Sequence, residues 1–270
     1  GVLSNHEVAP ILLEALKRLE YRGYDSAGIA TIQNGVIDRR RAEGKLFNLS
    51  DLLVHNPLPG KSGIGHTRWA THGEVSVKNA HPHHFGRVCV VHNGIIENFH
   101  ELTEELITSG LKPCTDTDTE IIAMLVELQL QTNISPLNAI RNVICQLKGA
   151  FALCFLFEGE EDLIIATRQG APLTIGYGID EMYIGSDAIA LAPFTKKISY
   201  LEDGDIAIVK RSRVQIECSG KQVDRQIKEI NLKTTHSYCS GFITNNNLKK
   251  LILLLQKKRK KNYKKTENTV

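Results

Sequence analysis

Three short stretches of the sequence concentrate side chains that could do chemistry. They read YRGYDSAG at residues 21–28, GHTRWATHG at 65–73 and HNGIIEN at 92–98. Each follows or ends an apolar run, and each brings guanidinium, imidazole, carboxylate or amide groups next to glycines. Those groups supply the hydrogen-bond donors and acceptors that bind a polar substrate. The polar residues exceed what packing requires, so the stretches are candidates for a functional site.

Each stretch also has a simpler structural interpretation. Arg22 and Asp25 could form an ion pair that only supports the fold, and the glycines could serve turns. Asn93-Gly94 is a common hairpin signal, and Trp69 could pack in a core. Taken one at a time, the stretches do not decide between these interpretations and a catalytic role.

Taken together they carry a family resemblance. LEYRGYDSAG at 19–28, GHTRWATHGE at 65–74, TDTDTE at 115–120 and GAFAL at 149–153 occur in this order. The chain resembles the class II (Ntn-type) glutamine amidotransferases, which use an N-terminal cysteine nucleophile, from Gly1 to about Asp224. Within them the motifs are similar to glutamine:fructose-6-phosphate aminotransferase (isomerising), rather than to the purine or asparagine branches.

The resemblance implies hydrolysis of L-glutamine to glutamate and ammonia, for the conversion of fructose 6-phosphate to glucosamine 6-phosphate in hexosamine biosynthesis. An N-terminal cysteine can be activated by its own α-amino group. The tetrahedral intermediate develops an oxyanion, which the family stabilises with an Asn side chain and the next Gly N–H. These positions correspond to Asn93 and Gly94.

The resemblance also assigns the substrate-binding residues. Arg68 would hold the carboxylate of glutamine, because a guanidinium can donate two parallel hydrogen bonds to it. Asp118 would receive the ammonium group, although an Asp at a helix start can also be a simple cap. Thr71 and His72 would complete the pocket wall. Arg22 and Trp69 would support the nucleophile's surroundings and the passage of ammonia.

We expect no metal and no cofactor. His66, His81, His83 and His84 are close in sequence, but no Cys or carboxylate spacing typical of zinc accompanies them. The six cysteines are scattered without a C-x-x-C pair. This distribution favours reduced thiols and a cytoplasmic location.

Two departures from the family concern the ends of the sequence. Family members begin Met-Cys-Gly-Ile-Val-Gly, and Gly1 aligns with the last Gly, so the chain as written lacks the nucleophile and is expected to be inactive. The alternative to an enzyme is therefore a glutamine-binding remnant. Residues 225–270 are expected to form a Lys/Asn-rich, disordered tail, and no sugar isomerase domain is recognisable there.

The pattern of apolar residues predicts the architecture. Helices are expected near 7–21, 97–109, 118–130 and 136–147, where apolar residues recur with helical spacing. Strands are expected near 27–32, 62–69 and 88–92, and in short runs from 150 to 209. Strands on both sides of a helical middle predict an α+β fold, with two largely antiparallel sheets. The resemblance makes this a four-layer αββα sandwich over residues 1–224.

Composition limits the partners. The chain has 270 residues, 42% hydrophobic and 23% charged, and a formal net charge of +3. Nine of its 33 basic residues lie between 248 and 265, so the remainder is acidic and nucleic-acid binding is not expected. No apolar run approaches the roughly 20 residues that cross a bilayer. We expect a monomer, with L-glutamine as ligand and fructose 6-phosphate only through domains that are not recognisable here.

Overall fold

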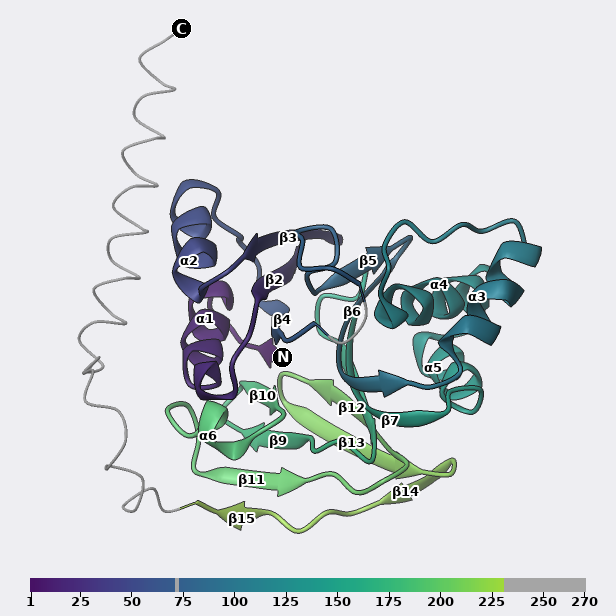
Figure 1. Ribbon diagram of the computed structural model, residues 1–270. Coiled ribbons are helices and arrows are strands. Elements are labelled where there is room, and N and C mark those ends of the chain that lie inside the picture. Colours follow the sequence, from purple (N-terminus) through teal and green to yellow (C-terminus); the bar gives the residue numbers. More distant parts are fainter. Residues whose placement is uncertain (71–72, 231–270) are drawn as a thin grey trace, which may run out of the picture. The chain divides into compact units, whose positions relative to one another are not determined.

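The computed structural model describes residues 1–70 and 73–230, and these form two stacked sheets with helices on both outer faces (Figure 1). Within the described residues, the first sheet has eight strands in the order β15-β11-β9-β10-β1-β4-β2-β3. Its members are β1 (Val2–Leu3), β2 (Ser26–Gln33), β3 (Val36–Glu43), β4 (Ser62–Arg68), β9 (Thr174–Tyr177), β10 (Met182–Gly185), β11 (Lys197–Tyr200) and β15 (Lys228–Glu229).

The second sheet has seven described strands in the order β14-β13-β12-β8-β7-β6-β5, and adjacent strands in both sheets pair antiparallel. Its members are β5 (His83–Phe85), β6 (Val88–Ile96), β7 (Gly149–Phe157), β8 (Ile164–Gln169), β12 (Asp205–Lys210), β13 (Arg213–Cys218) and β14 (Lys221–Val223). The two antiparallel sheets predicted from the sequence are confirmed.

Strand β6 shows why the sheets stack. Successive side chains of a strand point to opposite faces, and here both faces are apolar. Val88 and Val90 pack toward the helices, whereas Cys89 and Val91 pack into the core between the sheets. A strand buried on both faces fixes the middle of a layered structure.

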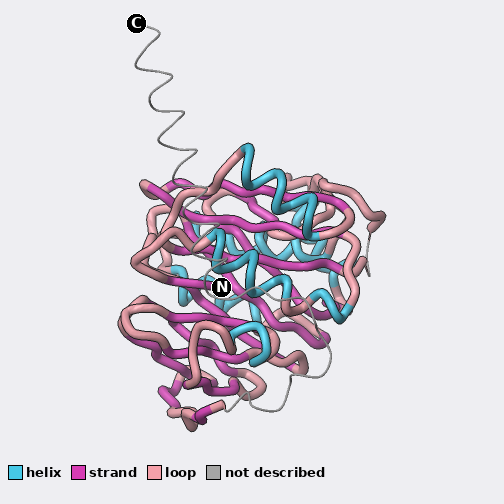
Figure 2. The backbone as a smooth tube through the Cα atoms, turned by 90° about the vertical axis from the view of Figure 1, so that its left-hand side faces the viewer, coloured by secondary structure: helices cyan, strands magenta, loops and turns pink. Residues whose placement is uncertain are grey.

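Helices cover each outer face, which completes the four layers. Beside the first sheet lie α1 (Ala9–Lys17), α2 (Leu46–His55) and the short α6 (Ala188–Leu191); η1 (Glu20–Arg22) follows α1. Beside the second lie α3 (Phe99–Thr108), α4 (Asp118–Gln131) and α5 (Pro136–Ile144). Figure 2 looks onto the molecule from the side of α1 and α2, with the strands behind these helices.

Several elements differ from the sequence prediction. Helix α2 was not predicted, although Leu46, Leu49 and Leu53 form its buried stripe. Strand β6 continues past His92 to Ile96, which brings Asn93 and Gly94 into the sheet. The compact unit extends to Ile230, past Asp224, because β15 pairs with β11. The predicted start of a disordered tail at residue 225 is therefore wrong for residues 225–230. Thr71, His72 and the rest of that predicted tail, residues 231–270, lie outside the described residues.

No helix in the described part of the chain is long and apolar enough to cross a membrane.

Candidate active site

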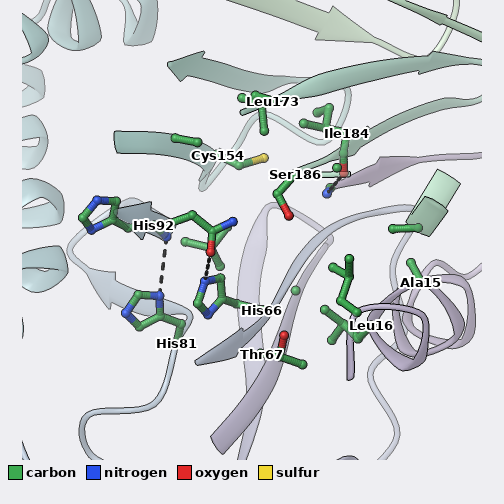
Figure 3. Close-up of a pocket in the computed structure, with 18 of the residues that line it drawn as sticks. Ala15, Leu16, His66, Thr67, His81, His92, Cys154, Leu173, Ile184 and Ser186 are labelled. Carbon is green, nitrogen blue, oxygen red and sulfur yellow. Dashed lines mark hydrogen bonds between the residues drawn. The ribbon is translucent and has the colours of Figure 1, made fainter. Parts of the chain in front are cut away.

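A pocket of about 300 Å³ lies where β4, β6 and α4 meet beside the start of β1. Six residues singled out from the sequence line it, namely Arg22, Arg68, Trp69, Asn93, Gly94 and Asp118. Gly1 lines the same pocket. Figure 3 shows other residues of its lining, among them His66, His92, Cys154 and Ile184. The expected convergence of these residues is therefore present, while Thr71 and His72 are outside the described residues.

Asn93 and Gly94 lie near the end of β6, opposite Ala152 and Phe151 of β7. The Asn93 carbonyl oxygen Oδ1 lies 2.8 Å from Nε2 of His66 on β4. Gly94 has φ of 130°, and a Cβ there would lie 2.0 Å from the backbone oxygen of Ala150. Only glycine fits this combination of dihedral angle and close approach. The pair is not a hairpin turn, because it continues a paired strand.

Asp118 is the first residue of α4, where a carboxylate is favoured by the helix dipole. It is not the N-cap, since the Thr117 side chain accepts the hydrogen bond from the Glu120 N–H. One carboxylate oxygen of Asp118 accepts from the Ile96 N–H at 3.0 Å, and the other from the Thr119 hydroxyl at 3.2 Å. The carboxylate is thus fixed by β6 and by its own helix.

Arg68 ends β4 and is buried, with 4% of its surface exposed. Its guanidinium donates to the backbone oxygens of Gly73 and Glu74 at 3.4 and 3.3 Å. Burial lowers the pKa of Arg68, and the charges of Asp25 and Asp118 oppose this. A guanidinium held between two carboxylates remains a cation and can receive the carboxylate of an amino acid.

The structure corrects the suggested pairing of Arg22 with Asp25. Arg22 instead donates to Asp187 at 2.8 Å and to the Ser186 hydroxyl at 3.0 Å, joining η1 to the start of α6. Asp25 accepts from the Ala70 N–H at 2.5 Å and lies 4.0 Å from Arg68. Asp25 therefore positions the segment that follows β4.

Trp69 is not a core residue, since 67% of its surface is exposed. Its ring lies against Gly23, where an added Cβ would come within 2.4 Å of the ring. Trp69 and Arg22 therefore stand at the entrance of the pocket, on segments that the sequence separates by more than forty positions.

At the pocket wall and behind it lies a cluster of buried histidines that the sequence analysis weighed only as metal ligands. The rings of His66 and His81 stack at 4.4 Å, and those of His81 and His83 meet edge to face at 4.9 Å. Burial lowers the pKa of His66 to about 4 and of His83 to about 3, and it lowers the pKa of His81 as well. These imidazoles are neutral at neutral pH.

The cluster is connected by hydrogen bonds to the Asp118 region. Thr119 Oγ1 lies 3.2 Å from both His81 Nε2 and His92 Nδ1, and Thr117 Oγ1 lies 3.1 Å from His83 Nε2. The TDTDTE motif supplies both threonines, a signal that sequence reasoning left unused. Within residues 1–70 and 73–230, no group of three or more His, Cys, Asp or Glu side chains could hold a metal ion.

Comparisons with known proteins agree with this geometry. A family model described as a glutamine amidotransferase domain matches residues 66–193. Among solved structures, the glutamine phosphoribosylpyrophosphate amidotransferase of B. subtilis, complexed with ADP and GMP, superposes with a TM-score of 0.70 at 25% identity, covering 80% of this chain and 48% of that one. The chain belongs to the glutamine amidotransferases with the Ntn-type sandwich fold.

Its curated relatives narrow the comparison to one branch. Glutamine–fructose-6-phosphate aminotransferase (isomerizing) of Brucella suis is 60% identical over 230 residues, which is 85% of this chain and 38% of the relative. The enzyme of the same name from Mesorhizobium japonicum is 55% identical over 227 residues, or 84% and 37%. The chain thus spans about 38% of the length of these relatives.

Proposed function

We propose that this domain hydrolyses L-glutamine to glutamate and ammonia. The observation that carries the proposal is the meeting of two groups of residues in one pocket. Arg68 and Asp118 offer a cation and an anion for the two charged ends of a free amino acid. Asn93 and Gly94 offer donors suited to the oxyanion of an amide under attack.

The roles follow from the charges and positions. Arg68 binds the α-carboxylate of glutamine, and Asp118 receives its α-ammonium group. The side-chain amide of glutamine then lies toward Asn93 and Gly94. Thr71 and His72 follow Trp69 in the chain, and we assign them to the wall that closes over glutamine. Arg22 and Trp69 support the entrance and its surroundings.

The nucleophile belongs to a cysteine placed ahead of Gly1. Gly1 and Ile184 exchange both backbone hydrogen bonds, at 2.7 and 2.8 Å, so β1 enters the pocket as a regular strand. The register against β4 pairs Leu3 with Ser62 and Val2 with Gly63. A residue four positions ahead of Gly1 in this register lies opposite Arg68, the last residue of β4. Cys-Gly-Ile-Val before Gly1 brings a free thiol there.

Gly1 is closely packed, since a Cβ there would lie 3.0 to 3.3 Å from the side chains of Cys154, Ile184 and Ile164.

The reaction then balances within the pocket. The α-amine removes the proton of the cysteine thiol, the thiolate attacks the side-chain carbonyl of glutamine, and the ammonium group so formed returns that proton to the leaving nitrogen as the C–N bond breaks. Ammonia departs and leaves a thioester, which water hydrolyses to glutamate and free thiol. By analogy with the aminotransferases that this chain resembles, we further propose that the ammonia serves aminotransfer to fructose 6-phosphate in the cytoplasm.

The test extends the chain with Cys-Gly-Ile-Val and verifies removal of the initiator Met. This protein should release glutamate and ammonia in equal amounts from L-glutamine, and not from L-asparagine. The matched control carries Ala-Gly-Ile-Val and should bind glutamine without turnover. Binding without turnover by the cysteine form would instead favour a glutamine-binding remnant. Absence of binding by both forms would contradict the proposed function.

A further inference from the structure

Within residues 1–70 and 73–230, one side chain, that of His66, forms a hydrogen bond with the side chain of Asn93, the proposed oxyanion donor. The contact joins β4 of one sheet to β6 of the other, across 27 positions of sequence, at 2.8 Å (Figure 3). Asn93 presents its carbonyl oxygen to the ring. Its amide nitrogen is therefore on the opposite side of the planar group, turned away from His66.

The geometry determines where the proton of His66 resides. An amide oxygen can only accept, so Nε2 of His66 must donate. The other ring nitrogen, Nδ1, is buried and makes no hydrogen bond of acceptable geometry in the part of the chain that the structure describes, although the backbone of His92 is close enough to raise the pKa of His66. An unpaired buried N–H is rarer than an unpaired acceptor. The neutral tautomer with its proton on Nε2 satisfies both conditions.

The ring itself is held in place. His66 is buried, and His81 stacks on it at 4.4 Å with an interplanar angle of 30°. His81 Nδ1 lies 3.4 Å from the backbone N–H of His92, the residue before Asn93, and its Nε2 lies 3.2 Å from Thr119. The same imidazole pair therefore contacts the residue that precedes the oxyanion donor and the residue that follows Asp118.

We propose that His66 is a positioning residue that holds the Asn93 carboxamide with its N–H₂ group facing the pocket, by donating Nε2–H to Asn93 Oδ1. If the amide turned over, its oxygen would face the developing oxyanion and repel it. The inference deepens the proposed function, on which it rests. His66 contacts neither end of glutamine in this arrangement, so its effect falls on the chemical step rather than on substrate binding.

A role limited to packing makes a different prediction. A ring that only fills space can be replaced by phenylalanine, which keeps the planar shape and removes the donor. Glutamine, in contrast, keeps a donor near the position of Nε2 and loses the ring. The two substitutions therefore separate shape from hydrogen bonding at one position.

The kinetic experiment uses the chain extended with Cys-Gly-Ile-Val. His66→Phe should lower kcat about 10- to 100-fold, somewhat less than the loss of an oxyanion donor itself, and leave KM for glutamine within about threefold. His66→Gln should recover most of the lost kcat. His55→Phe, at an exposed position of α2, is the matched control and should retain the original kcat.

Three kinetic outcomes overturn the inference. They are an unchanged kcat in His66→Phe, a rise in KM without loss of kcat, and a His66→Gln variant as slow as His66→Phe. If the extended parent chain itself shows no turnover, the proposed function fails, and the inference is then decided by a measurement that needs no activity.

That measurement is ¹⁵N NMR of the imidazole nitrogens in the 270-residue chain, with the His66 ring assigned through bonds from its own backbone resonances. The expected result is a neutral ring at pH 7 that carries its proton on Nε2. A proton on Nδ1 would require the Asn93 amide to donate to His66, and would overturn the inference whether or not either variant folds.

Discussion

The two sides of the pocket are built differently. The inner wall consists of His66, Asn93, Gly94 and Asp118, which stand on β4, β6 and α4 and are bonded to other buried groups. The rim consists of Arg22 and Trp69, and Trp69 is 67% exposed; Tyr21, which is 63% exposed, bonds Arg22 beside it. The wall is fixed by strands and desolvated hydrogen bonds, whereas the rim is fixed by polar contacts at the surface.

The difference has a chemical reason. Donors aimed at a developing oxyanion are effective when they are arranged beforehand in a site of low dielectric. In the proposed reaction the entrance must admit glutamine and release glutamate, and weak surface contacts suit that need. Arg68 joins the two sides, since it is buried at the end of β4 yet bonds the backbone of Gly73 and Glu74.

The largest expected effect tests the burial of two histidines, His66 in the inner wall and His83 behind it. The folded pKa values of His66 and His83, about 4 and about 3, lie below the usual 6.5. The unfolded chain therefore binds more protons below pH 6.5, and stability falls as the pH drops toward 3. Each histidine contributes on the order of 3 kcal/mol over this window.

Urea unfolding between pH 7 and pH 4.5 measures this dependence. His83→Gln should flatten the curve relative to the parent chain, since one buried titrating group is removed. His55→Gln, on exposed α2, should leave the curve unchanged. Equal slopes for all three chains would show that the histidines behind the wall do not titrate as buried groups.

The next effect tests the close approach of β6 to β7. Gly94→Ala should destabilise the fold by roughly 3 kcal/mol or more, because the added methyl meets the Ala150 oxygen at 2.0 Å and φ is 130°. Gly110→Ala is the matched control, with φ of 84° and nothing within 4 Å of the new Cβ. It should cost about 1 kcal/mol. If both variants lose the same free energy of unfolding in urea, the close approach of β6 to β7 is not what makes Gly94 necessary.

A smaller effect is expected at the residue that joins wall and rim. Arg68→Lys should weaken glutamine binding about 10- to 100-fold, because a lysine cannot donate two parallel hydrogen bonds to a carboxylate. Titration calorimetry with the 270-residue chain measures it directly. Arg141→Lys, which alters an ion pair with Glu217 instead, should bind glutamine as the parent does. If Arg68→Lys binds glutamine with unchanged affinity, Arg68 does not bind the carboxylate of glutamine.

Much of the fold was accessible from the sequence, because periodicity reports burial. The helices near 97–109, 118–130 and 136–147 correspond to α3, α4 and α5 within a few residues. Helix α2 was missed although its leucines recur at helical spacing. Short strands such as β10 have too few residues to show a period, and their pairing depends on distant partners.

The site was accessible only in part. The motifs located Arg68, Asn93, Gly94 and Asp118, but a one-dimensional pattern does not show which side chains bond each other. The contact of His66 with Asn93 links two sheets, and that of Arg22 with Asp187 spans 165 positions. The ion pair suggested between Arg22 and Asp25 was wrong for this reason. It was inferred because the two residues are close in sequence, whereas the partner in space is Asp187.

The smallest expected effect concerns the rim itself. Arg22 and Asp187 are 38% and 23% exposed, and exposed ion pairs contribute about 0.2 to 1 kcal/mol. A double-mutant cycle with Arg22→Gln and Asp187→Asn should give a coupling energy in that range. Asparagine keeps an oxygen for the Ile189 N–H at the start of α6, so the cap survives. The coupling should shrink further in 1 M salt, because exposed charges are screened. A salt-independent coupling above about 2 kcal/mol would show a rim as firmly held as the inner wall, and glutamine would then have to enter past a closed ion pair.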